Sequence, residues 1–147
     1  LEVIPIFSLL LLSAKLITYI LLYNDAGRES GRPPKKRKED MAVIELTDAT
    51  FDQELGSDPG LTVVDFWAPW CAPCRMVGPI VEELAEDMKD TIKVCKVNID
   101  ENQAVAQTYD VRAIPTLILF AGGKAAARLV GVRPRADIEK EIQAALQ

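Results

Sequence analysis

The sequence predicts an α/β fold in which a mixed β-sheet lies between helices. Short apolar runs alternate along the chain with segments whose apolar residues recur at helical spacing. The run 61–67 is apolar almost throughout, as is typical of a strand buried on both faces of a sheet. Two later strand-like runs are separated by Gly122-Gly123, which indicates a hairpin. Strands and helices that alternate in this way form a layered α/β sandwich.

The first predicted elements lead into this central strand. Residues 43–46 are expected to form a short strand. Thr47 and Asp48 offer an N-cap to a following helix, and the run 56–60, which holds two glycines and a proline, ends that helix. The chain then enters the strand 61–67.

A longer helix is predicted after Cys71. Pro79 lies within it and is expected to kink it, because proline lacks an N–H group and clashes with the preceding turn. The apolar residues of this helix fall on one stripe, which we expect to pack on the sheet: Val77, Ile80, Val81, Leu84, Ala85 and Met88.

The C-terminal half adds three strands and two helices. We predict strands over 92–99, 116–120 and 126–130, and a short helix over 104–109. Pro134 marks the start of the last helix. The apolar face of that helix holds Ile138, Ile142, Ala145 and Leu146.

The chemistry is predicted to lie at Cys71 and Cys74, which are separated by two residues. A cysteine at the start of a helix lies among unsatisfied backbone N–H groups and near the positive end of the helix dipole. Both stabilise the thiolate, so we expect the thiol pKa of Cys71 to be lowered. We also expect Cys71 to be partly exposed. Cys74 lies one turn further on, close enough to attack a mixed disulfide on Cys71. This pair is the minimum equipment for thiol–disulfide exchange.

Other roles for the cysteines are less well supported. A structural zinc site usually takes four Cys or His ligands, whereas the chain has three cysteines and no histidine, so we expect no metal site. A structural disulfide framework needs paired cysteines in a secreted protein. Cys95 lies on a predicted buried strand and is expected to be an inert core thiol, with a regulatory oxidation site as the alternative.

Charge divides the chain into two parts. Residues 1–40 carry seven Lys/Arg and five Asp/Glu, a net of +2, whereas residues 41–147 carry ten and seventeen, a net of −7. An acidic domain is a poor partner for nucleic acid, so we expect none for residues 41–147. The absence of histidine from the sequence excludes Cys-His and Ser-His nucleophile pairs and leaves sulfur as the obvious nucleophile.

Three regions follow from these patterns. Residues 1–23 form an apolar segment about as long as the ~20 residues of a membrane span, although Lys15 lies within it. Residues 24–40 form a linker that we expect to be disordered, with a basic cluster at 33–38. Residues 41–147 hold the folded domain. The apolar segment is either a membrane anchor, which would leave the domain on the cytoplasmic side, or a non-native extension with no role in the chemistry.

Four separated segments resemble a known family: Val-Asp-Phe-Trp-Ala-Pro-Trp-Cys-Ala-Pro-Cys at 64–74, Lys-Val-Asn-Ile-Asp at 96–100, Val-Arg-Ala-Ile-Pro-Thr at 111–116 and Val-Gly at 130–131. With these segments, residues 41–147 resemble a thioredoxin over almost their full length. A lone CxxC motif is weak evidence. A WCxPC motif with an upstream Asp and a downstream Ile-Pro-Thr at the family spacing is far more specific. The resemblance does not extend to the N-terminal extension.

The resemblance implies a thioredoxin fold, with a five-stranded mixed sheet flanked by four helices, and a set of catalytic residues. Cys71 resembles the attacking thiol and Cys74 the resolving thiol. Asp65 resembles a buried carboxylate that takes a proton from the resolving cysteine, and burial should raise its pKa toward neutrality. Lys96 resembles a lysine that lies near this carboxylate and tunes it. The alternatives are a satisfied polar group at a strand edge for Asp65 and a solvated strand lysine for Lys96.

The resemblance also implies a substrate-binding surface. Pro115 resembles the cis-proline of the family, which leaves a backbone edge free for a substrate peptide. Ile114 and Gly131, together with Trp70, resemble the apolar shelf that receives this peptide. Trp70 alone would equally suit a partly buried surface aromatic, and Trp67 is expected in the core.

The residues between the cysteines are expected to support the active site and tune its redox potential. Ala72 stands where the family usually has glycine, whereas Pro73 is kept. Because alanine is small, we expect a modest shift in potential.

We therefore predict a protein-disulfide reductase, a thiol–disulfide oxidoreductase that passes two electrons from its dithiol to disulfide-bearing proteins. No bound cofactor is expected, and the resemblance implies that an NADPH-dependent thioredoxin reductase returns the electrons. The expected location is the cytoplasm, with a membrane tether that carries a cytoplasmic domain as second choice. The alternatives are a disulfide oxidant or isomerase, marked by a potential of about −120 or −180 mV instead of about −270 mV, and a non-enzymatic scaffold or accessory subunit.

Overall fold

A computed structural model of the chain describes residues 43–56 and 60–147. The predicted apolar segment 1–23 and basic linker 24–40 lie outside the described residues. Within the part that is described, no helix is long and apolar enough to cross a membrane.

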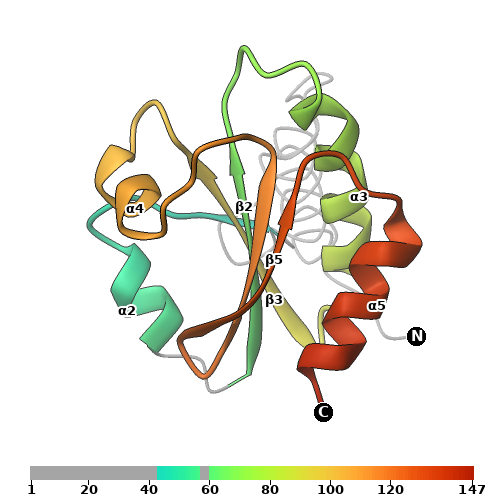
Figure 1. Cartoon of the computed structure of the whole chain (residues 1–147). Coiled ribbons are helices and arrows are strands. Elements are labelled where there is room, and N and C mark those ends of the chain that lie inside the picture. Colours follow the sequence, from blue (N-terminus) through green and yellow to red (C-terminus); the bar gives the residue numbers. More distant parts are fainter. Residues whose placement is uncertain (1–42, 57–59) are drawn as a thin grey trace, which may run out of the picture. The chain divides into compact units, whose positions relative to one another are not determined.

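A five-stranded sheet, with strand order β1-β3-β2-β4-β5, forms the centre of the domain. Strands β1 and β2 run parallel to β3, whereas β4 is antiparallel to both β2 and β5, which confirms the predicted mixed sheet (Figure 1). The strands are β1 (Val43–Glu45), β2 (Leu61–Trp67), β3 (Ile92–Asn98), β4 (Thr116–Ala121) and β5 (Lys124–Val130).

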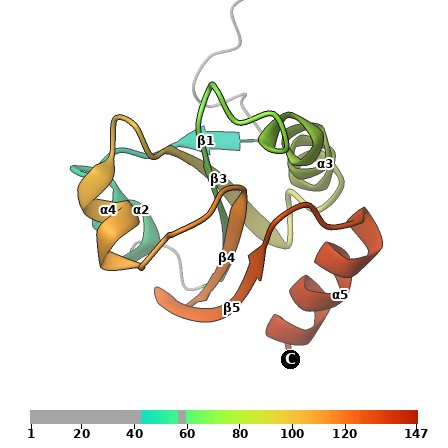
Figure 2. The ribbon, with the colours of Figure 1, turned by 45° about the horizontal axis from the view of Figure 1, so that its top comes forward.

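Four helices of the described chain flank this sheet, as predicted: α2 (Phe51–Gly56), α3 (Cys74–Asp87), α4 (Gln103–Thr108) and α5 (Arg135–Ala145). Helices α2 and α4 cover one face of the sheet, and α3 and α5 cover the other, as both views show (Figures 1 and 2). The arrangement is the thioredoxin fold that the sequence predicts.

The face under α3 and α5 is built from the predicted helical stripe. Val77, Val81, Leu84 and Ala85 of α3 are buried, and Ile80 and Met88 pack against them at the margin. Because successive residues of a strand point to opposite faces, alternate positions of the central strands complete this core. Their contributions are Leu61, Val63, Val94, Leu117 and Leu119.

The face under α2 and α4 is aromatic. The Phe51 ring lies 5.3 Å from that of Tyr109 and 5.8 Å from that of Phe120, measured between centroids, and Phe66 lies 6.4 Å away. Tilted and edge-on ring pairs at these distances add to the energy of burial. Cys95 is buried in this same layer, in accordance with its expected place in the core.

The predicted N-cap at Thr47-Asp48 is correct for Thr47, which lies at the start of α2, and wrong for Asp48, which caps α4. Thr47 does organise the turn before α2, where its backbone N–H donates to Thr50 Oγ1 at 3.0 Å. The Asp48 carboxylate instead accepts the backbone N–H groups of Val105 at 2.9 Å and Ala104 at 3.3 Å, at the start of α4. Asp48 therefore caps a helix 56 to 57 residues away in the sequence. A capping pattern within a few residues does not predict such a contact.

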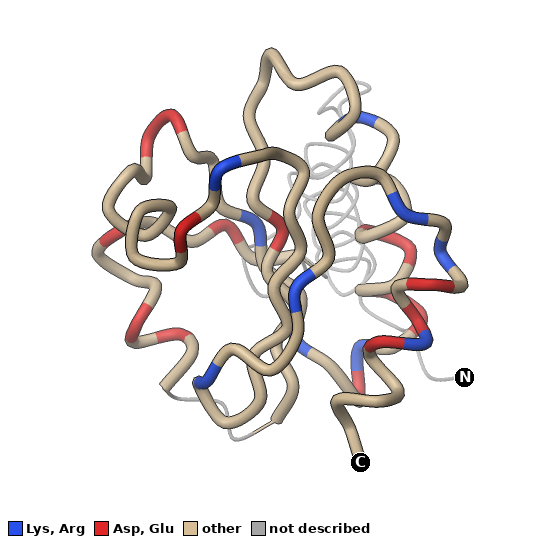
Figure 3. Tube along the Cα trace, viewed as in Figure 1, with Lys and Arg blue, Asp and Glu red and all other residues tan. Residues whose placement is uncertain are grey.

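The C-terminal elements form largely as predicted. Gly122 and Gly123 have positive φ angles of 54° and 76°, which glycine adopts without strain and which the tight hairpin between β4 and β5 requires. Pro134 directly precedes α5. Figure 3 shows acidic residues in the C-terminal half of α3 and residues of both signs on α5. Arg135 of α5 joins the two helices through Glu83 at 3.1 Å and Asp87 at 2.6 Å.

Candidate active site

Cys71 and Cys74 are joined by a disulfide, with their Cα atoms 5.3 Å apart. Helix α3 begins at Cys74, three residues after Cys71. The Cys74 backbone N–H donates to Cys71 Sγ at 3.2 Å. The sulfur of Cys71 thus accepts one of the N–H groups that a helix leaves unpaired at its start, a contact that favours a thiolate over a thiol at this atom.

The prediction that Cys71 is partly exposed is wrong for this disulfide form. Cys71 is 3% exposed and Cys74 5% exposed, so the two are equally buried. Both pack with Ala68 in a small cluster that Ile99 and Ile114 border. The helix start therefore gives Cys71 its favourable hydrogen bond, while the neighbouring loops cover it.

Asp65 lies on β2, buried at 1% exposure within the predicted apolar run. Its Oδ1 atom has no hydrogen-bond partner among the described residues. Burial raises the pKa of Asp65 from 3.8 to about 7, against the opposing effect of the Lys96 charge and with a further increase from Glu82. A carboxyl with this pKa exchanges its proton near neutral pH, which suits a general base.

Lys96 lies directly beside Asp65, because the two residues are register partners on β3 and β2. Its ammonium group, however, donates to Glu82 Oε1 at 3.1 Å and lies 5.4 Å from the centre of the Trp67 ring. Glu82 was not predicted to belong to the site. Nothing in the sequence distinguishes it from the adjacent Glu83, and only the packing of α3 on the sheet brings it to Lys96.

Trp70 lies next to Cys71 and is 65% exposed, so it is a surface aromatic. Its indole N–H donates to both carboxylate oxygens of Asp100, at 2.9 and 3.1 Å. This contact joins the loop after β2 to the loop after β3 and fixes the ring at the edge of the disulfide. Asp100 is a second site residue that was not predicted from the sequence.

Ile114, Pro115 and Gly131 come together beside the disulfide cluster. The peptide bond between Ile114 and Pro115 is cis, as the resemblance implied. The Gly131 backbone N–H donates to the Pro115 carbonyl at 2.8 Å, and Gly131 has a φ of +81°, a conformation that residues other than glycine rarely adopt. Exposed Val130 and Val132 flank this glycine and extend the apolar surface.

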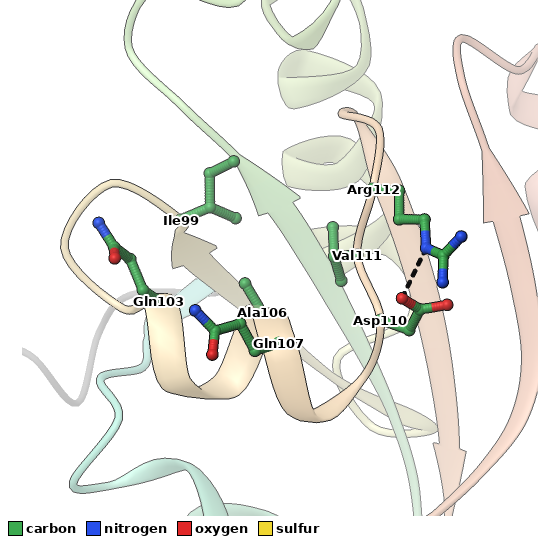
Figure 4. A pocket seen from close by; sticks show the side chains of 7 residues that line it. All are labelled: Ile99, Gln103, Ala106, Gln107, Asp110, Val111 and Arg112. Atoms are coloured by element: carbon green, nitrogen blue, oxygen red, sulfur yellow. Dashed lines mark hydrogen bonds and ion pairs between the residues drawn. The ribbon is translucent and has the colours of Figure 1, made fainter.

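A hollow of about 440 Å³ opens on the other side of Ile99 (Figure 4). It lies between α4 and the segment that leads to the cis-proline, where Arg112 Nε donates to Asp110 Oδ1 at 2.7 Å. Its lining is partly polar and consists of Ile99, Gln103, Ala106, Gln107, Asp110, Val111 and Arg112. Ile99 therefore borders both the disulfide cluster and this hollow.

The remaining predicted positions also lie at this edge. Ala72 and Pro73 are exposed between the two cysteines, and the Ala72 carbonyl accepts the Arg75 N–H at 3.2 Å. Within residues 43–56 and 60–147, no group of three or more His, Cys, Asp or Glu side chains is placed to hold a metal ion.

Comparison with known proteins identifies the family. Residues 42–144 match the family model described as Thioredoxin. The chain belongs to the thioredoxin family. It is 46% identical over 102 residues to "Thioredoxin 1" of Nostoc sp., an alignment that covers 69% of this chain and 95% of that protein.

Two further relatives agree with this assignment. The chain is 50% identical over 93 residues to "Thioredoxin 1" of Synechococcus elongatus, which covers 63% of this chain and 87% of that protein. It is 43% identical over 106 residues to "Thioredoxin" of Alicyclobacillus acidocaldarius, which covers 72% of this chain and 100% of that protein. With the Cys71–Cys74 disulfide, these relationships confirm the predicted activity: the domain is a thiol–disulfide oxidoreductase that acts as a protein-disulfide reductase.

Proposed function

We propose that Cys71 is the attacking thiol and Cys74 the resolving thiol of this reductase. In the reduced protein, the Cys71 thiolate attacks one sulfur of a substrate disulfide. A new S–S bond forms to Cys71, the substrate S–S bond breaks, and the other substrate sulfur leaves as a thiolate that takes a proton from water. The hydrogen bond from the Cys74 N–H to Cys71 Sγ supports this assignment, because it stabilises negative charge on the Cys71 sulfur.

The second step uses Asp65 as the proton acceptor. The Cys74 thiol gives its proton to the Asp65 carboxylate, and the resulting thiolate attacks Cys71 Sγ. The mixed disulfide breaks, the second substrate thiolate leaves, and the Cys71–Cys74 disulfide forms, so that the substrate gains two electrons and the protein loses two. The pKa of Asp65 near 7 supports this role, because an acceptor is most effective when its pKa lies near the working pH. Lys96 tunes this carboxyl through its adjacent charge.

The substrate binds over the apolar edge formed by Trp70, Ile114, Pro115 and Gly131. Trp70 and the exposed valines beside Gly131 offer apolar surface on two sides of the disulfide. Unfolded or loop segments of disulfide-bearing proteins fit such a surface, because their side chains are free to spread over it. Ala72 and Pro73 hold the turn between the cysteines and set the redox potential.

An NADPH-dependent thioredoxin reductase returns two electrons to the Cys71–Cys74 disulfide, and the domain works in the cytoplasm. The domain itself needs no bound cofactor. Residues 1–23 bring the domain to a membrane only if they are a true anchor.

The single observation that carries this proposal is the disulfide at the start of α3, on the sheet face that buries Asp65. Its test is the redox midpoint of the Cys71–Cys74 pair in a dithiothreitol series, read by tryptophan fluorescence, together with NADPH consumption in the presence of a thioredoxin reductase and insulin. A midpoint near about −270 mV with coupled NADPH oxidation supports a cytoplasmic reductant. A midpoint above about −200 mV, or no coupling, contradicts it.

A further inference from the structure

Lys96 lies in a row of charges that crosses three neighbouring strands. Glu45 of β1 and Asp65 of β2 are its register partners on either side. Register partners in parallel strands point their side chains to the same face of the sheet, so both carboxylates flank the lysine on the face that α3 covers. Helix α3 adds a third carboxylate, Glu82, which is the one in contact with the ammonium group, at 3.1 Å.

Lys96 has open space beside it. A hollow of about 250 Å³ lies against it, lined also by Trp67, Asn98 and Glu101. Its side chain is 19% exposed, whereas that of Glu82 is 59% exposed. A lysine has a long flexible stem, so the ammonium group has more than one carboxylate within its reach, and in this structure it pairs with Glu82.

Asp65 is a neighbouring carboxylate with which Lys96 does not form the ion pair. Its Oδ1 is buried without a hydrogen-bond partner, although a lysine lies in register with it. A buried carboxylate gains more from a cation than an exposed one does, because water screens it less. The observed pairing of Lys96 with the exposed Glu82 therefore leaves the buried carboxyl short of a partner, in a protein whose chemistry uses that carboxyl.

We propose that Glu82 is a positioning residue of the reductase, which holds the Lys96 ammonium at the outer side of α3 and thereby keeps Asp65 able to accept the Cys74 proton. The inference rests on the proposed role of Asp65. Glu82 itself touches neither substrate nor the reacting sulfur atoms, and it acts through Lys96.

Among the described residues, few other charged groups lie near Asp65 that could change its proton affinity. Lys96 lies beside it on the neighbouring strand β3, and Glu45 lies one strand further away on β1. Glu82 and Cys74 belong to α3. Its partner on β4 is the uncharged Leu117. Helix α5 packs Ile138, Ile142 and Ala145 against this layer.

Direct titration of Asp65 tests the proposal without reliance on activity. The full chain, oxidised, is labelled with ¹³C-aspartate, and the buried carboxyl is assigned by its loss in Asp65→Asn. Glu82→Gln should lower the pH midpoint of Asp65 by about 0.5–1 pH unit, because the variant both removes a negative charge and frees Lys96. Glu141→Gln makes the same change of charge on α5, outside this cluster, and should leave the midpoint unchanged.

A double-mutant cycle shows whether Glu82 acts through Lys96. Lys96→Met should raise the midpoint of Asp65, because the lysine charge lowers it. In the Lys96→Met protein, Glu82→Gln should shift the midpoint by less than half of its effect in the wild-type protein. An equal shift in both backgrounds, or no shift in either, overturns the proposal. Glu82→Asp, which keeps the charge, should give an Asp65 midpoint close to that of the wild-type protein.

Kinetics then separate this inference from the proposed catalytic role. Reduced protein and Ellman's disulfide reagent give one thionitrobenzoate ion when Cys71 attacks and a second when Cys74 resolves. If Asp65 is the proton acceptor, the pH midpoint of the second phase should fall in Glu82→Gln together with that of the carboxyl. If Asp65→Asn leaves the second phase unchanged, the role of Asp65 fails, and the carboxyl titration still decides whether Glu82 positions Lys96.

Discussion

The two faces of the sheet are built from the same strands but hold different groups. Under α2 and α4 the central strands present Val64, Phe66 and Val97, and three aromatic rings surround Phe51. Under α3 and α5 the alternate positions of the same strands present Asp65 and Lys96 among apolar residues. One face thus serves mainly stability, whereas the other also carries a buried charge next to a helix that begins with a redox-active cysteine.

This difference shows how a small domain separates stability from chemistry. A strand that is buried on both faces can place an unfavourable group on one of them because the opposite face contributes a well-packed apolar layer. The cost of burying Asp65 is also the source of its raised pKa.

Replacing the attacking thiol should abolish activity without unfolding the domain. Cys71→Ser should reduce insulin no faster than dithiothreitol alone does, because serine provides no thiolate at neutral pH. The matched control is Cys95→Ala, which removes the cysteine of the aromatic face and should retain turnover per folded molecule. Loss of turnover in the folded control, or persistent turnover in Cys71→Ser, would contradict the assignment of Cys71 as the attacking thiol.

Truncating the centre of the aromatic face should affect stability and not chemistry. Phe51 is 1% exposed and contacts three other rings, so Phe51→Ala should lower the free energy of unfolding by about 3–5 kcal/mol. Urea unfolding of the oxidised protein measures this loss. The rate of insulin reduction, normalised to the folded fraction, should stay within about twofold of the wild-type rate, since the variant leaves the helix start intact. A much larger fall in the normalised rate would show that the two faces are coupled.

The buried carboxyl should make stability depend on pH. The folded protein holds the Asp65 proton more tightly than the unfolded chain does, because burial raises this pKa from 3.8 to about 7. Its favourable contribution is complete below about pH 3.8 and is lost as the pH rises to about 7, a change of up to about 4 kcal/mol for a shift of about three pKa units.

Comparison with Asp65→Asn isolates this contribution. Urea unfolding of both oxidised proteins from pH 5 to pH 8 should show the variant gaining stability relative to wild type as the pH rises. A constant difference over this range would mean that Asp65 does not titrate in the folded state.

Loss of the helix cap on the aromatic side should have the smallest effect. Asp48→Ala removes the acceptor for the N–H groups of Val105 and Ala104 and should lower stability by about 1 kcal/mol. Asp90→Ala, a change of the same kind at an exposed turn, serves as the control and should have little effect. Equal losses in the two variants would argue that charge, and not capping, produces the change.

The sequence predicted those features that depend on local pattern. The apolar run 61–67 predicted that Asp65 lies on a buried strand, whereas its catalytic role came from the family resemblance. A two-residue spacing before an amphipathic helix identified the cysteines. The helical stripe of α3 likewise needed only its period. Residue types and spacing are sufficient for these features because the element that positions each group is adjacent to it in the chain.

The features that the sequence did not predict depend on contacts between distant segments. Glu82 meets Lys96, and Asp100 meets Trp70, only after helix and loops have packed on the sheet. The prediction that Cys71 is partly exposed was wrong for the same reason, because loops distant in sequence, at Ile99 and Ile114, border it.

The central claim is that the charged face performs the proton transfer of the reductase. Its most direct test is the pH dependence of the second thionitrobenzoate phase, measured by stopped flow in the wild type and in Asp65→Asn. The wild-type rate should follow a group with a midpoint near pH 7, and the variant should be slower and lack this midpoint. Identical pH profiles for the two proteins would contradict it.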